Sequence, residues 1–217
     1  DPFDVVTFNL LDMLDSLDEF VTFEEGDLVV RLHRDEAAVL KDYVLPLAQR
    51  ALDDLSARYE LRPEGPILIE VFPRHDDFAV RTLGLPGMIG ALGACFGKVV
   101  TLDSPRARTP GDFNWGATLW HEMAHVITLQ MSNQRVPRWL TEGLSTFEQK
   151  RARPDWARDQ DLGFATALNE DNVLSLRELN RGFSRPETIS MAYFQASVLV
   201  EHIVEEYGES TIHQLLR

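Results

Sequence analysis

The pattern of apolar and polar positions divides the chain into a mixed first half and a helical second half. Apolar residues recur every three positions near the start, at Phe8, Leu11, Leu14 and Leu17. This spacing predicts a short helix over residues 4–17. The stretch FVTFEEGDLVVRLH then alternates on both sides of a Glu-Gly-Asp turn, which predicts a β-hairpin. A longer helix is predicted from Asp35 to about Tyr59, with a kink or break at Pro46.

Two more strands are predicted before residue 110, in PILIEVFP and from Lys98 to Asp103, with one or two helical turns in HDDFAVRTLG between them. After Asn114 the apolar period becomes helical. Helices are predicted near residues 115–131, 137–150, 161–169, 175–180 and 188–207, and Gly208 ends the last of them. We therefore expect an α+β protein with an N-terminal α/β lobe over residues 1–110 and a mainly helical lobe over residues 111–217.

Composition and charge exclude several classes of protein. The apolar fraction of 44% is that of a globular chain, and the formal net charge is −14. Such an acidic surface repels nucleic-acid phosphates and anionic membranes. No apolar window is long enough for a transmembrane helix. The single cysteine, Cys95, cannot form an internal disulfide, and we expect it to be a small buried residue.

Two features of the sequence bear on the origin of the chain. The sequence begins at Asp1, so we expect a piece of a longer protein, and its last residues resemble the opening of a further helix. Only three of the 21 basic residues are lysines, which favours a GC-rich bacterial genome. The compartment stays open, with an exported location favoured over the cytoplasm.

The stretch ATLWHEMAHVITLQ places titratable groups in an otherwise apolar helix. His121 and His125 are four positions apart and therefore share one helix face, where both imidazoles can bind one metal ion. Glu122 lies beside them, where it can face a metal-bound water, as in the H-E-x-x-H pattern of zinc hydrolases. Two histidines packed in a core without an ion, or a metal site without catalysis, are the alternatives.

A third ligand is available 17 positions after His125. A turn through MSNQRVP would let a second helix run back beside the first and bring Glu142 to the histidine pair. One Zn²⁺ per chain, held by two imidazoles and a carboxylate, lowers the pKa of its water to about 7. Glu122 could then take the proton of that water and pass it to a leaving amine.

These two segments resemble a known group of enzymes. HEMAH followed by WLTEG is similar to the gluzincins, metallopeptidases whose third zinc ligand is a glutamate on the next helix. WLTEG is similar to the W-L-x-E-G signature of M1 aminopeptidases, and the short gap resembles the peptidase-MA-like domains of bacterial multidomain proteins, which often adjoin tetratricopeptide repeats. The resemblance covers about residues 85–207. It implies a zincin-like fold, with the active-site helix at the junction of the two lobes.

The resemblance also implies residues outside the two helices. Gluzincins stabilise the oxyanion with a tyrosine or histidine, and Tyr193 is the candidate here, with a core tyrosine as the alternative. Their sheet edge pairs with extended substrate, and GALGACFGKVVTLD is its expected equivalent, with a flexible glycine-rich loop as the alternative. The G-x-M-E-N signature of the exopeptidases is absent, which favours an endopeptidase.

Two functions follow from these observations. The first is a zinc-dependent peptidase that acts on a peptide or protein substrate, with ligands His121, His125 and Glu142 and with Glu122 as general base. The second is a catalytically silent, metal-stabilised scaffold or interaction domain of a larger protein. The position of Glu122 favours the peptidase, because a purely structural site needs no carboxylate beside an open coordination position.

Overall fold

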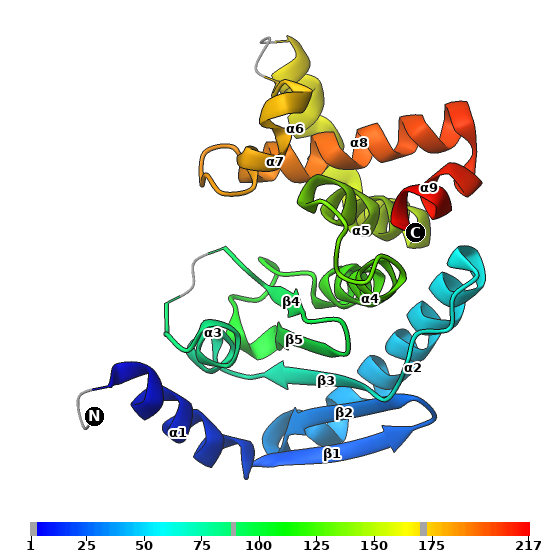
Figure 1. The fold of residues 1–217 in the computed structure, drawn as a ribbon. Helices are drawn as coiled ribbons and strands as arrows, with labels where there is room; N and C mark the ends of the chain where they lie inside the picture. The colour runs from blue at the N-terminus through cyan, green and yellow to red at the C-terminus, as the bar shows by residue number, and fades with distance from the viewer. Residues whose placement is uncertain (1–3, 88–89, 170–172) are drawn as a thin grey trace. The chain divides into compact units, whose positions relative to one another are not determined.

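The computed structural model describes residues 4–87, 90–169 and 173–217 (Figure 1). Within them, one five-stranded mixed sheet lies in the first half of the chain, and helices make up almost all of the second half. This arrangement confirms the α+β class predicted from the sequence, and it is compatible with a zincin-like fold. No helix in the described part of the chain is both long and apolar enough to cross a membrane.

The chain forms two compact units, each containing two segments. The first is Asp1–Asp54 with Glu64–Val126, and the second is Leu55–Pro63 with Ile127–Arg217. The divisions fall inside two continuous helices, α2 (Arg34–Tyr59) and α4 (Trp115–Met131), so each of these helices contributes residues to both units. The division into lobes after residue 110 stays a prediction.

The sheet of the first unit has the order β1-β2-β3-β5-β4. The predicted hairpin is confirmed as β1 (Phe20–Glu25) and β2 (Leu28–His33), which pair antiparallel. β3 (Ile67–Phe72) pairs parallel with β2 and with β5 (Val99–Asp103). The short strand β4 (Gly93–Cys95) pairs antiparallel with β5 and forms one edge of the sheet.

The two faces of this sheet differ in chemistry because side chains alternate along each strand. One face carries Glu70, which is fully buried and accepts a hydrogen bond from Arg81 Nε at 2.8 Å. Arg81 belongs to α3 (His75–Leu83), which therefore covers that face, while α1 (Val5–Leu17) packs on α3. The opposite face is aliphatic, with fully buried side chains at Ile69, Val100 and Leu102 and Val71 close to fully buried. Figure 1 shows α2 passing behind the sheet, opposite α3.

The second unit is helical. It contains α5 (Arg138–Ala152), α6 (Arg158–Asn169), α7 (Leu176–Gly182), α8 (Ile189–Tyr207) and α9 (Glu209–Leu216), together with a 3₁₀ turn at Pro154–Ala157. Another 3₁₀ turn, Pro105–Ala107, lies in the first unit. The helices predicted after Asn114 are confirmed to within a few residues. Of the kink or break expected at Pro46, the break is wrong, because α2 continues through this residue, and the kink stays a prediction.

A buried ion-pair cluster joins α5 to the end of α2 inside the second unit. Glu148 is 1% exposed, pairs with Arg58 and accepts a hydrogen bond from the Tyr59 hydroxyl at 3.1 Å. A second arginine, Arg151 of α5, has its Nη1 atom 3.9 Å from Glu148 Oε1. Burial raises the pKa of Glu148, and the two arginines oppose that shift. Because an unpaired buried carboxylate is so unfavourable, this pairing fixes α5 against α2.

Candidate metal centre

The helix that carries the H-E-x-x-H pattern is buried along most of its length. The Asn114 side chain accepts a hydrogen bond from the Ala117 N–H at 3.1 Å, which satisfies one of the free donors in the first turn of α4. Trp120, Met123 and Val126 are all at most 1% exposed. α4 is therefore held in the core by its apolar side chains, which leaves Glu122 and His125 buried and His121 half-buried.

The two histidines of α4 face each other. The Nε2 atoms of His121 and His125 are 3.1 Å apart, and the ring centroids are separated by 4.8 Å. Two ligands of a tetrahedral zinc ion are separated by roughly 3.3 Å when each lies about 2.05 Å from the metal. The spacing of the two nitrogens therefore matches that of two imidazoles converging on one ion.

The helix pair that follows brings in the predicted third ligand. Inside the second unit, Thr128 of α4 and Thr141 of α5 are hydrogen-bonded through their hydroxyls at 2.8 Å, so the end of α4 is joined to the start of α5. Glu142 comes next along α5. Candidate ligand atoms of His121, His125 and Glu142 all lie within 4.8 Å of one another.

The burial of these groups supports a bound cation. His125 is 8% exposed and Glu142 is 9% exposed. Holding a buried carboxylate beside two imidazoles is favourable only when a positive charge or hydrogen bonds compensate the carboxylate, and a divalent cation bound by all three groups would do so. Two imidazoles and one carboxylate form a typical donor set for catalytic zinc, so the residues present fit this metal.

The predicted general base lies beside the sheet edge. Glu122 is 5% exposed, and a Cβ atom placed on Gly93 would be only 2.7 Å from Glu122 Oε1 and 2.9 Å from Thr118 Cγ2. Only a glycine in β4 allows this approach, because real Cβ atoms do not come so close to other heavy atoms. Within the glycine-rich segment, Gly93–Cys95 form the edge strand β4, and the backbone of β4 at Gly93 passes close to the carboxylate of Glu122.

Strand register places Cys95 near the same carboxylate. Gly93 pairs with Leu102 and Cys95 pairs with Val100, so both residues of β4 point to the face that α4 covers. Burial raises the pKa of the Cys95 thiol, and the negative charge of Glu122 raises it further. Cys95 is a half-buried, protonated thiol, where the sequence had predicted a small buried residue.

Tyr193 lies in the second unit on α8. Its ring packs edge-on against Phe183, with the ring centroids 5.1 Å apart and the planes at 85°. It is half-buried at the border of an apolar cluster that includes Leu179 and Ala196. Both a packing role and a catalytic role are compatible with this position, so its function as an oxyanion donor stays a prediction.

Sequence reasoning missed one residue close to the candidate ligands. Arg138 begins α5, and its Nε lies 3.5 Å from Glu142 Oε1. The guanidinium also lies over the ring of Phe183, 5.3 Å from its centroid. The signal was present in the sequence, because Arg138 stands four positions before Glu142 and so shares its helix face.

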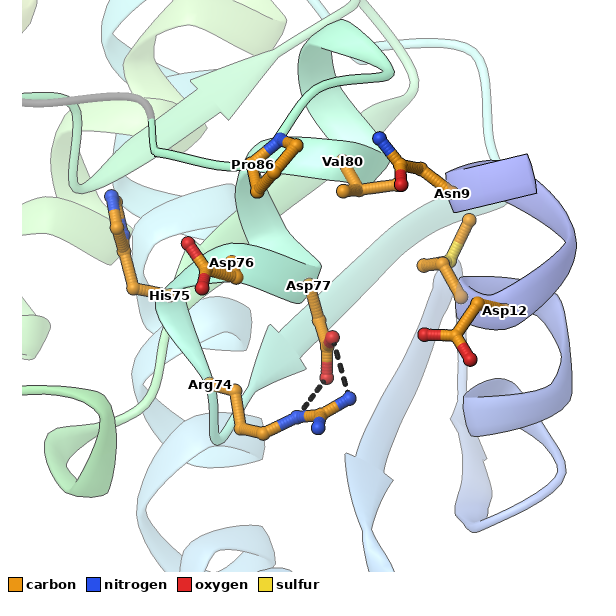
Figure 2. Close-up of a pocket in the computed structure, with 9 residues that line it drawn as sticks. Asn9, Asp12, Arg74, His75, Asp76, Asp77, Val80 and Pro86 are labelled. Carbon is orange, nitrogen blue, oxygen red and sulfur yellow. Dashed lines mark hydrogen bonds and ion pairs between the residues drawn. The ribbon is translucent and has the colours of Figure 1, made fainter. Parts of the chain in front are cut away.

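A separate cavity of about 370 Å³ lies beside α1 and α3 in the first unit (Figure 2). Arg74 donates two hydrogen bonds of 2.7 Å to the Asp77 carboxylate at its lower edge. Asp12 of α1 faces this pair. None of the predicted site residues lines this cavity, so it is distinct from the candidate metal centre.

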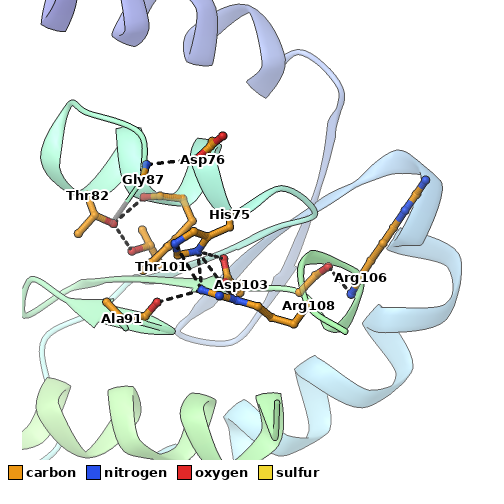
Figure 3. A network of polar contacts seen from close by, with 11 residues as sticks. His75, Asp76, Thr82, Gly87, Ala91, Thr101, Asp103, Arg106 and Arg108 are labelled. Atoms are coloured by element: carbon orange, nitrogen blue, oxygen red, sulfur yellow. Dashed lines mark hydrogen bonds and ion pairs between the residues drawn. The ribbon is translucent and has the colours of Figure 1, made fainter. Parts of the chain in front are cut away.

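A polar network fixes the loop that leads from the sheet to α4 (Figure 3). Asp103 is fully buried at the end of β5 and accepts a hydrogen bond from Arg108 Nε at 2.7 Å. The same carboxylate lies 2.9 Å from Nδ1 of His75, at the start of α3. The network satisfies a carboxylate that would otherwise be unpaired in the core, and it anchors the chain a few residues before α4 begins.

Comparison with known families finds a match, which covers the part of the chain that contains the candidate site. A family model described as the Peptidase MA superfamily matches residues 88–217. The match begins just before β4 and includes α4, α5 and α8, which carry all the predicted site residues. A search of curated proteins finds no match.

Proposed function

This chain belongs to the Peptidase MA superfamily, and we propose that it is a zinc-dependent metallopeptidase that hydrolyses internal peptide bonds. The observation that carries the proposal is the convergence of His121, His125 and Glu142, with the buried carboxylate of Glu122 next to the first ligand on α4. A purely structural metal site would not need this additional carboxylate.

His121, His125 and Glu142 would hold the ion. When bound, a divalent cation supplies Lewis acidity, which polarises a carbonyl oxygen and makes a neighbouring water more acidic. Glu122 accepts the proton of the attacking water at its carboxylate and returns it to the leaving amide nitrogen. The buried position of Glu122 suits this role, because a carboxylate held away from bulk water accepts and returns a proton readily.

The edge strand β4 would position the substrate. Its outer side ends the sheet, and an extended peptide can add there as a further strand through main-chain hydrogen bonds. Because Gly93 lies against Glu122, a peptide aligned on β4 would run past the general base. Tyr193 is proposed to donate its hydroxyl hydrogen to the oxyanion.

The substrate class follows from what the chain lacks. The M1 signature that anchors a free amino terminus does not occur in this sequence, which favours cleavage within a chain over aminopeptidase activity. We therefore expect blocked peptides to be cleaved as well as peptides with free ends.

The test is to measure zinc content and cleavage of a blocked peptide library by the wild type and by Glu122→Gln. This substitution removes the base and keeps the shape of the side chain, so zinc should be retained while cleavage falls by about 10²–10⁴-fold. Cleavage that survives unchanged would exclude Glu122 as the base. Tightly held zinc with no cleavage by the wild type would instead favour the metal-stabilised scaffold.

A further inference from the structure

Arg138 places a positive charge beside the candidate ligand Glu142, and no step of the proposed function uses it. The two side chains lie one turn apart on α5, with Nε 3.5 Å from Glu142 Oε1. This distance is at the limit of a hydrogen bond, so the contact is weak. In the described part of the chain Glu142 is the single acceptor of Arg138, which leaves the other guanidinium N–H groups for another acceptor.

The guanidinium is held in place from one side. It lies over the ring of Phe183, which is 2% exposed and packs with Leu179 and Ala192. The Asn180 side chain accepts a hydrogen bond from the Trp139 N–H at 2.9 Å, and so fixes the end of α7 to the start of α5. A cation stacked on an immobile aromatic ring loses little rotamer freedom when it binds a ligand.

The other side of the guanidinium is open. The Arg138 side chain is 48% exposed, although it begins the helix that carries a 9% exposed candidate ligand. The protein as a whole is strongly acidic, with a formal net charge of −14, and would repel an anionic peptide. The fixed and accessible Arg138 guanidinium therefore places a local positive charge next to Glu142 on a protein that is negatively charged overall.

We propose that Arg138 binds a carboxylate of the peptide substrate and so determines a preference for acidic substrates, an inference that rests on the proposed function. The planar guanidinium matches a carboxylate through two parallel N–H···O bonds. That carboxylate can be an acidic side chain near the cleaved bond or the C-terminus of the peptide. Both present the same chemistry to Arg138.

Cleavage of matched peptides tests this assignment. Each pair of peptides differs by one Glu→Gln change or by a C-terminal carboxylate replaced with an amide, which distinguishes the two sources. Arg138→Gln should lower the ratio of kcat/KM for acidic over neutral peptides by about 10- to 100-fold, the range for a hydrogen bond to a charged group. The control Arg177→Gln, at an exposed position of α7, should leave the ratio unchanged.

A binding measurement separates this inference from the proposed catalysis. Labelled acidic and neutral peptides are titrated into Glu122→Gln, with and without Arg138→Gln, and followed by fluorescence anisotropy. We expect Arg138→Gln to lower the affinity for the acidic peptide at least tenfold more than the affinity for the neutral peptide. If the wild type cleaves nothing, the proposed function fails, yet the binding result still decides the role of Arg138. Equal affinities for both peptides, or no binding of either, overturn the inference.

Discussion

Replacing Gly143 with alanine should destabilise the protein through one crowded helix contact. A Cβ atom at this position would lie 2.6 Å from the carbonyl oxygen of Ala196, 2.8 Å from its carbonyl carbon and 3.1 Å from its Cβ. Ordinary contacts begin near 3.4 Å, so α5 and α8 must separate by about 0.8 Å. Two of the three atoms belong to the backbone of α8 and cannot turn away.

The magnitude follows from two opposing terms. Overpacking of this kind destabilises a protein by about 1–3 kcal/mol, and backbone contacts place Gly143→Ala near the upper value. The higher helix propensity of alanine returns about 1 kcal/mol. The net loss is about 2 kcal/mol, which lowers the Tm of a chain of this size by about 4–8 °C.

Thermal unfolding followed by circular dichroism measures this loss. Ser145→Ala is the matched control, because Ser145 lies two residues further along α5 and its buried hydroxyl has no hydrogen-bond partner among the residues that the structure describes. Its Tm should stay constant or rise, since the change removes an unsatisfied polar group and adds no atoms. Zinc affinity should fall in Gly143→Ala alone, because the shift of α5 carries Glu142 with it. A Tm for Gly143→Ala equal to or above the wild type would refute the reasoning.

Three further predictions concern the buried carboxylates and the sheet edge. Arg58→Met leaves Glu148 without its main partner and should lower the free energy of unfolding, measured by urea titration, by about 3 kcal/mol. The double variant Arg58→Met with Glu148→Leu should recover most of this lost stability. Burial, and then the charge of Glu148, raises the pKa of Tyr59 well above 10.0, so the unfolded tyrosine ionises first and stability should fall as the pH rises beyond 10.0. Tyr59→Phe should reduce this loss of stability, which is checked by comparing the free energy of unfolding of both proteins below and above pH 10.0. Gly93→Ala should displace the Glu122 carboxylate and lower kcat by about 10- to 100-fold, with zinc content by mass spectrometry unchanged.

Much of the fold could be predicted from the sequence because its signals are local. The apolar period of 3.6 gave α4 its bounds, and the four-residue spacing of His121 and His125 placed both rings on one face. The Glu-Gly-Asp turn between alternating stretches predicted the β1–β2 hairpin for the same reason. Each of these predictions depends on residues within one helix turn or one strand pair.

The helix does not break at Pro46, for a reason that local rules omit. A proline inside a helix removes one hydrogen bond and crowds the preceding turn. α2 nevertheless continues from Arg34 to Tyr59, with Val44, Ala48, Ala51 and Leu55 buried on both sides of the proline. Packing of the apolar face of α2 outweighs the loss of that bond, because tertiary burial along several turns is larger than one local defect.

The sequence by itself therefore determined the helices that carry the candidate metal ligands and the spacing of His121 and His125 on one of them, since helical periodicity and spacing are properties of short segments. Only the tertiary structure decided that Gly93 lies against Glu122, that Glu148 pairs with Arg58 and that Arg138 stacks on Phe183. These partners are 29 to 90 residues apart in the chain. Such contacts depend on strand register and on which helix faces meet, and both are set by the packing of the whole core rather than by any local pattern.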